Sequence, residues 1–117
     1  MDKKRVVELS IIANKVRKNA LTAVYSAASG HPGGSLSISD VLTLLYYEVM
    51  NVDPKDPKNP DRDRFVLSKG HCAPALYGVL AEKGFFPKED IATLRKTGSY
   101  LQGHPDMKGV PGVDMST

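Results

Sequence analysis

The sequence has little cysteine, no tryptophan and no long apolar run. Among its 117 residues there is one cysteine, Cys72. A single thiol excludes an internal disulfide framework and argues against a zinc site built from cysteines. We expect Cys72 to be a small buried residue near a helix start; the alternative is a reactive thiol.

No run approaches the ~18 apolar residues of a transmembrane helix, and the N-terminus lacks the apolar region of a signal peptide. We therefore expect a cytoplasmic protein with no membrane partner.

Basic residues outnumber acidic ones, and the excess gathers near the N-terminus. The 16 Lys and Arg against 13 Asp and Glu give a formal net charge of +3. The clustered cations are Lys3, Lys4, Arg5, Lys15, Arg17 and Lys18. A basic helix can bind nucleic acid, but no aromatic residue interleaves with these charges, so a base-stacking platform is not supported. We expect a solvated helix face and no nucleic-acid partner.

Apolar residues near the N-terminus recur at helical spacing. The repeat positions are Leu9, Ile12, Ala13, Val16, Ala20, Val24 and Ala27. Their spacing of three and four predicts a helix over residues 4–29. Gly30, followed closely by Pro32, is typical of the stop at a helix C-terminus.

The next segments predict a loop and a second helix. Residues 30–37 are rich in glycine and predict a loop, after which Ser37 and Asp40 resemble the capping pair at a helix start. The following residues, as far as Met50, are apolar nearly all round, which predicts a helix buried on several sides. Three prolines in residues 51–64 then predict a surface loop.

The second half of the chain predicts one strand among further helices. Phe65-Val66-Leu67-Ser68 is a strand candidate, helices are expected over residues 72–83 and from Pro87 to Gly98, and residues 99–117 predict a loop. A lone strand cannot satisfy its backbone donors and acceptors, so it needs neighbours that this segment does not supply. The predicted class is therefore α/β, with residues 1–117 forming part of a larger domain whose sheet other sequence or a partner chain completes.

The three histidines share one local setting. Each directly follows a glycine, as Gly30-His31, Gly70-His71 and Gly103-His104, and His31 and His104 also precede a proline. Glycine lets the backbone turn sharply, and proline restricts the preceding histidine to extended conformations. Three such turns meeting in space would form a polar pocket with groups that transfer protons near neutral pH. The alternatives are ordinary surface histidines or a three-histidine metal site, although the spacing matches no local metal motif.

The turn at Lys69-Gly70-His71 is a separate candidate for ligand binding. A glycine-containing turn that leads into a helix points backbone N–H groups at one spot, which favours an anion. Lys69 and His71 would add side-chain donors. The turn is not a P-loop, because the GxxxxGK[ST] pattern is absent.

Three stretches together resemble the N-terminal part of transketolases. They are Ser29-Gly30-His31-Pro32-Gly33-Gly34, Asp63-Arg64-Phe65-Val66-Leu67-Ser68-Lys69-Gly70-His71 and Gly103-His104-Pro105. Their order and approximate spacing are those of the family, and the similarity covers essentially the whole chain. The form resembles the N-terminal subunit of split, two-subunit transketolases. The resemblance implies that residues 1–117 are the helix-rich N-terminal part of a parallel-sheet domain that binds thiamine diphosphate.

The resemblance also implies a role for each matching residue. His31 would assist proton transfer near the reacting carbonyl and bind substrate hydroxyls, and His104 would bind the terminal hydroxyl of the donor sugar. His71 would contact the diphosphate of the cofactor, with assistance from Lys69. The implied reaction moves a two-carbon ketol unit between sugar phosphates, a step of the pentose phosphate pathway.

Other parts of the family's site have no counterpart in this sequence. The Gly-Asp-Gly segment that holds the divalent metal, Mg²⁺ or Ca²⁺, is absent, as is the glutamate that activates the cofactor's aminopyrimidine. Metal, cofactor activation and full activity would then depend on remaining sequence or a C-terminal transketolase subunit, in a homo-oligomer or a heteromer. Two alternatives stay open: another thiamine-diphosphate enzyme such as deoxyxylulose-phosphate synthase, or a small helical anion-binding interaction module.

Overall fold

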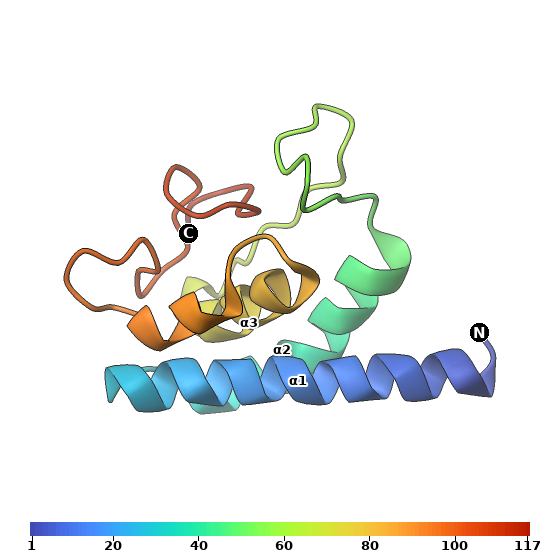
Figure 1. Ribbon diagram of the computed structural model, residues 1–117, viewed down its shortest axis with the longest axis horizontal. Helices are drawn as coiled ribbons and strands as arrows, with labels where there is room; N and C mark the ends of the chain where they lie inside the picture. The colour runs from blue at the N-terminus through green and yellow to red at the C-terminus, as the bar shows by residue number, and fades with distance from the viewer.

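The computed structural model describes residues 1–117, and all of its regular structure is helical. In chain order the elements are α1 (Lys3–Ala27), α2 (Pro32–Leu44), η1 (Leu45–Val49), η2 (Gly70–Cys72), α3 (Ala73–Lys83) and η3 (Lys88–Thr93). The long helix α1 lies along one side of the molecule, and the irregular segments lie on the opposite side, with α2 and α3 between them (Figure 1). None of the helices combines the length and the apolar character that a membrane-spanning segment needs.

The first helix forms as its periodicity predicts. Asp2 caps its start, because the carboxylate accepts a hydrogen bond from the backbone N–H of Arg5 at 2.8 Å. The helix ends two residues earlier than predicted: Ala28 takes the left-handed conformation, with φ 51°, and its N–H bonds back to the last turn. Gly30, with φ 133°, therefore carries the chain away from the helix rather than ending it.

The predicted loop over residues 30–37 is wrong, because α2 already begins at Pro32. Proline suits the first helical turn, where its missing N–H costs no hydrogen bond. Gly34 lies inside this helix, and a methyl group there would collide with the sulfur of the buried Cys72. Glycine at this position thus allows α2 to approach the start of α3 closely. Ser37 and Asp40 lie within α2 and do not cap it.

The second helix is less buried than its apolar sequence predicts. Leu42 and Tyr46 lie in the core, but Val41, Leu44 and Val49 are 52%, 41% and 62% exposed. After Leu44 the helix widens into the π-helical turn η1. The prediction of burial on several sides is therefore wrong for residues 1–117.

The predicted strand does not form. Exposure alternates over Phe65, Val66 and Leu67, which are half-buried, 50% exposed and 2% exposed, and this is the burial pattern of a strand. No second segment pairs with its backbone, so the α/β class with a parallel sheet is not confirmed within residues 1–117. The requirement for neighbours explains why the local strand signal produces no sheet.

The third helix is the centre of the core. It is buried from Ala73 to Ala81 and contacts α1, α2 and η3. It ends at Gly84, in the left-handed conformation with φ 103°, as predicted. The predicted helix after Pro87 is instead the 3₁₀ element η3, which ends before Gly98. Residues 99–117 form no helix or strand, as their glycines and prolines predict.

A largely buried ion pair fixes the C-terminal segment to the rest of the molecule. The carboxylate of Asp114 lies 2.9 Å from Nε of Arg62, and these side chains are 6% and 17% exposed. The same carboxylate accepts a hydrogen bond from the backbone N–H of Phe65 at 2.9 Å. Asp114 thus joins residues 105–117 to the segment that leads to Lys69 and His71.

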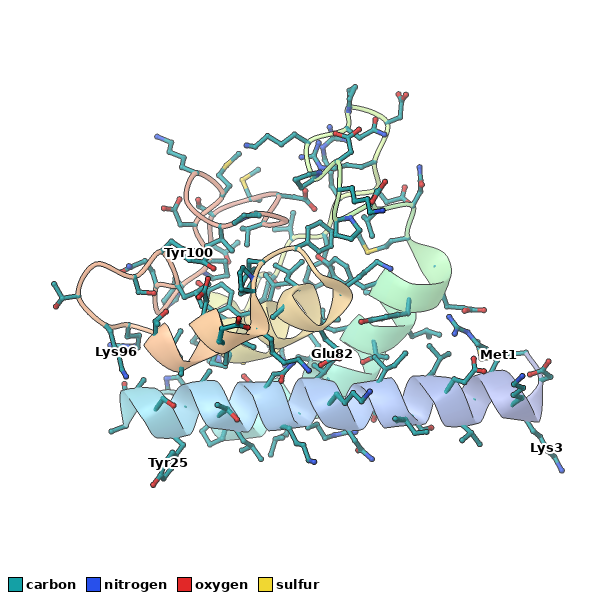
Figure 2. The ribbon with its side chains drawn as sticks, in the orientation of Figure 1. Met1, Lys3, Tyr25, Glu82, Lys96 and Tyr100 are labelled. Atoms are coloured by element: carbon teal, nitrogen blue, oxygen red, sulfur yellow. The ribbon has the colours of Figure 1, made fainter.

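The basic face of α1 is partly neutralised within the chain. Arg5 pairs with Glu48 at 2.9 Å, and Arg17 forms an ion pair with Asp40. The outer side of the helix is exposed: Tyr25 is 87% exposed and points away from the body of the protein, as does Lys3 (Figure 2). This agrees with the predicted solvated helix face.

Candidate functional site

The three histidines, although 40 and 33 positions apart in sequence, line one surface pocket. Its lining residues are Gly30, His31, His71, Pro74, Leu94, Arg95, Gly103 and His104. The pocket therefore lies where the chain enters α2 and α3, beside the irregular segment after η3. No aspartate or glutamate belongs to this lining, so the pocket is suited to hydroxylated or anionic ligands.

His31 and His71 lie side by side in the pocket. Their rings are 5.2 Å apart between centroids and meet edge to face at 86°. His31 occupies the N-cap position of α2, but its side chain makes no capping hydrogen bond, so the imidazole is free to face a ligand. His71 lies in η2, where the chain enters α3. Both histidines are exposed.

His104 reaches the same pocket because Gly70 has no side chain. A methyl group on Gly70 would lie 2.7 Å from Nδ1 of His104. That nitrogen also lies 3.3 Å from the carbonyl oxygen of Thr117. The turn that carries His71 and the turn that carries His104 thus pack directly against each other, which no spacing in the sequence reveals.

Tyr77 holds the turn that carries His104. Its hydroxyl donates to the carbonyl oxygen of Gln102 at 2.6 Å and lies 3.3 Å from that of His104. Burial, followed by the nearby charge of Asp106, raises the pKa of Tyr77 well above its ordinary value. The hydroxyl therefore stays protonated, as a donor, throughout the neutral and mildly alkaline range. Sequence reasoning missed this residue, because within the apolar run of α3 it resembles any other core aromatic.

Replacing Tyr77 with phenylalanine should loosen the His104 turn without opening a cavity. Loss of the hydroxyl leaves the carbonyl oxygen of Gln102 without its donor, and we expect a cost of about 1–2 kcal/mol in the free energy of unfolding. The check is denaturant unfolding of the wild type and Tyr77→Phe. Tyr47→Phe is a matched control. Tyr47 takes part in contacts through its backbone carbonyl oxygen and its ring, and its hydroxyl makes no hydrogen bond. Equal stabilities of Tyr77→Phe and wild type would contradict this role.

Lys69 is not part of the pocket lining. Its ammonium group donates to the carbonyl oxygen of Gly34 at 3.3 Å, so it links the segment before η2 to the first turns of α2. The structure thus brings together three of the four predicted site residues, with Lys69 beside them and half-buried. Its predicted contact with a diphosphate stays a prediction.

Arg95 is the pocket residue that sequence reasoning did not find. It follows η3, is exposed, and lines the pocket together with the three histidines. Its backbone lies in the left-handed region, with φ 62°. The local sequence Leu94-Arg95-Lys96 resembles an ordinary solvated helix end, so it offers no signal of this position.

Residues 1–117 contain no cluster of side chains suited to bind a metal ion. No group of three or more His, Cys, Asp or Glu side chains is placed to hold a metal ion. The three histidines share a pocket but are not arranged as ligands of one metal. A three-histidine metal site, the alternative left open by the sequence, therefore has no support in the structure.

Comparison with known proteins identifies the family. Residues 9–117 match the family described as transketolase, thiamine diphosphate binding domain. The chain belongs to the transketolase family. The match covers nearly the whole chain and includes all three histidines of the pocket.

Similar proteins agree with this assignment. The chain is 49% identical over 111 residues to a 6-deoxy-6-sulfo-D-fructose transketolase subunit of Clostridium sp. strain MSTE9, a match that covers 95% of the chain and 40% of that protein. It is 48% identical over 113 residues to an apulose-4-phosphate transketolase subunit of Phocaeicola vulgatus, covering 97% of the chain and 40% of that protein. Residues 1–117 therefore correspond to less than half the length of these transketolase subunits.

The fold agrees with solved transketolases. The transketolase from Leishmania mexicana superposes with a TM-score of 0.89 at 35% identity, over 93% of this chain and 16% of that one. A Pichia stipitis transketolase superposes with a TM-score of 0.87 at 38% identity, over 96% of this chain and 16% of that one. The helical arrangement of residues 1–117 is thus that of a small portion of a transketolase.

Proposed function

We propose that this chain forms the N-terminal part of a transketolase, which moves a two-carbon ketol unit from a ketose phosphate to an aldose phosphate. The observation that supports this most directly is the pocket lined by His31, His71 and His104 within a transketolase domain. No observation favours another thiamine-diphosphate enzyme such as deoxyxylulose-phosphate synthase, because the matched family is transketolase. None favours a small helical anion-binding module either, because part of the basic face of α1 is ion-paired.

We assign His31 and His104 to the substrate and its protons. An imidazole can donate or accept a proton near neutral pH, which suits transfer to and from sugar hydroxyls. His31 has its side chain free of the helix cap, and His104 is held by a turn anchored on Tyr77. We propose that His31 exchanges a proton with a reacting oxygen and that His104 binds and orients a terminal hydroxyl.

The donors near η2 fit the diphosphate of thiamine diphosphate. Lys69 uses one hydrogen bond on Gly34, which leaves ammonium protons for an anion, and His71 is exposed beside it. We propose that these two side chains contact the diphosphate. When bound, the cofactor supplies stabilisation of a carbanion, which side chains alone cannot provide.

We propose that a divalent cation, Mg²⁺ or Ca²⁺, accompanies the cofactor and is held by residues outside this segment. A diphosphate site needs the charge of such an ion, and residues 1–117 offer no cluster to bind it. Those ligands would come from further sequence or from a partner chain, since similar proteins are themselves named as subunits of transketolases. The working enzyme would be a homo-oligomer or a heteromer acting on sugar phosphates in the cytoplasm.

The proposal is tested by comparing residues 1–117 alone with the complete protein. We expect no measurable ketol transfer from the isolated segment when it is supplied with thiamine diphosphate, Mg²⁺ and a ketose–aldose phosphate pair, because it lacks metal ligands. The complete protein, with its partner chain where one exists, should transfer the unit under the same conditions. Absence of transfer in the complete protein would contradict the proposed function, and transfer by the isolated segment would contradict the need for further residues.

A further inference from the structure

The long helix α1 carries a second apolar stripe, on the side that faces away from the rest of the protein. Its inner side supplies the core with Leu9, Ala13, Val16, Ala20 and Ala23. On the outer side Val7, Ile11 and Leu21 are 57%, 51% and 46% exposed. Tyr25 belongs to the same side and points into solvent (Figure 2). A surface helix needs one apolar side to join the core, so a second one left exposed is typical of a binding surface.

The residues of the outer stripe repeat with the spacing of a coiled-coil seam. Successive positions lie four and three residues apart in strict alternation, which is the spacing of the a and d positions of a heptad. All six positions are exposed: Val7, Ile11, Asn14, Lys18, Leu21 and Tyr25. Such a stripe is narrow, and its side chains fit between those of one facing helix. We call these six residues the outer seam.

The middle of the outer seam is polar, because Asn14 and Lys18 lie between its two apolar ends. A polar residue at a seam position weakens a coiled coil but fixes the register of the two helices, since it requires a polar residue opposite. A helix that lies flat in a membrane surface needs a wider and unbroken apolar side. The pattern therefore favours a helical partner over a lipid surface.

The unpaired charge along the outer seam is positive. Lys3, Lys4 and Lys15 are exposed on this side together with Lys18, and none of the four takes part in an ion pair. The carboxylates of this part of the chain are already engaged: Glu8 pairs with Arg5, and Asp2 caps the helix. Two copies of such a seam would repel each other in either direction, whereas a helix with acidic flanks would be attracted.

From these observations we propose that the outer seam of α1 is the docking site for an acidic amphipathic helix of another polypeptide. The apolar side chains of that helix pack against Val7, Ile11 and Leu21, and its carboxylates pair with the lysines beside them. A glutamate opposite Lys18 satisfies the charge in the middle of the seam and sets the register. No residue of the seam lines the histidine pocket, so the inference is independent of the proposed function.

The test is fluorescence anisotropy of a labelled synthetic peptide titrated with the complete protein. The peptide is a helix of about 21 residues, three heptads, with leucine at its seam positions and glutamate at the flanking positions. It should bind, whereas a peptide with the same leucines and lysine flanks should not. Ile11→Ser combined with Leu21→Ser should weaken binding of the acidic peptide by about tenfold or more, because two apolar side chains lose their burial.

Met107→Ser combined with Met115→Ser is the matched control for loss of apolar surface. These two side chains are 40% and 49% exposed outside α1, and their replacement should change the affinity by less than about twofold. For charge, Lys15→Glu with Lys18→Glu should weaken binding by about tenfold or more, and Lys55→Glu with Lys58→Glu, in an exposed loop, should have a much smaller effect. All of the replaced residues are exposed, so the variants should keep the fold, which thermal melting checks.

Four results would overturn the proposal. Absence of binding to the complete protein would show that its remaining sequence covers the seam. Binding that Ile11→Ser with Leu21→Ser leaves unchanged would reduce it to attraction between opposite charges. Sedimentation that shows self-association lost in this double variant would assign the seam to a second copy, and co-sedimentation with vesicles of anionic phospholipid lost in the same variant would assign it to a membrane surface.

Discussion

Replacing His104 with alanine in the complete protein should lower kcat by about 100- to 10,000-fold, the range expected for loss of a group that positions substrate or transfers a proton. The structure places this imidazole against Gly70, within the pocket shared with His31 and His71. The turn that carries it is anchored by Tyr77, so His104 is held in place before substrate arrives. The measurement is steady-state ketol transfer, with thermal melting to confirm that the variant is folded.

The controls for this prediction lie in the same segment. Met107→Ala changes an exposed residue three positions further on and should leave kcat unchanged within about twofold. His104→Gln, which keeps a hydrogen-bonding group, should retain more activity than the alanine variant if the main role is to hold a hydroxyl. A folded His104→Ala variant with kcat within about threefold of the wild type would contradict any role in the reaction.

Replacing Asp114 with alanine should destabilise the protein by about 2–3 kcal/mol, because it breaks a largely buried ion pair and leaves the cation of Arg62 without its carboxylate. The carboxylate is 6% exposed and holds both the guanidinium of Arg62 and the N–H of Phe65, each at 2.9 Å. Its loss therefore removes two charge-assisted bonds that join the C-terminal segment to the segment leading to His71. The free energy of unfolding in urea measures the effect.

Two further variants separate the contribution of the Arg62–Asp114 ion pair to stability from general effects of charge. Asp61→Ala removes an exposed carboxylate nearby and should change the free energy of unfolding by less than about 0.5 kcal/mol. Replacing both partners with apolar residues, Arg62→Met with Asp114→Leu, should cost less than Asp114→Ala, since no unpaired charge stays buried. Equal stability of Asp114→Ala and Asp61→Ala would show that the pair contributes nothing.

Local sequence patterns are sufficient to predict α1 and the end of α3. The periodicity of α1 and the glycine that ends α3 each depend on neighbours in sequence. The start of α2 was predicted wrongly, because Gly33 and Gly34 are typical of a loop. Gly34 is required instead for contact with Cys72, 38 positions away in sequence, and no local pattern contains that contact. The prediction of a strand at residues 65–68 is wrong for the opposite reason. Its local signal is strong, but a strand needs a neighbouring strand to pair with.

The candidate site was predictable in its residue types and not in its geometry. The glycine before each histidine marked His31, His71 and His104 as unusual, and the family resemblance supplied their expected roles. That Gly70 makes room for His104 is a tertiary contact between residues 34 positions apart. Sequence reasoning missed Arg95 as a lining residue, because its place in the pocket depends on a left-handed turn that appears only in the folded chain.

The most direct measurement is a crystal structure of the complete protein with thiamine diphosphate and a ketose phosphate. We expect sugar hydroxyls within about 2.7–3.2 Å of imidazole nitrogens of His31 and His104, with His71 beside the diphosphate. A sugar bound at another surface, with the three imidazoles facing only solvent, would contradict the assignment of this pocket to the substrate.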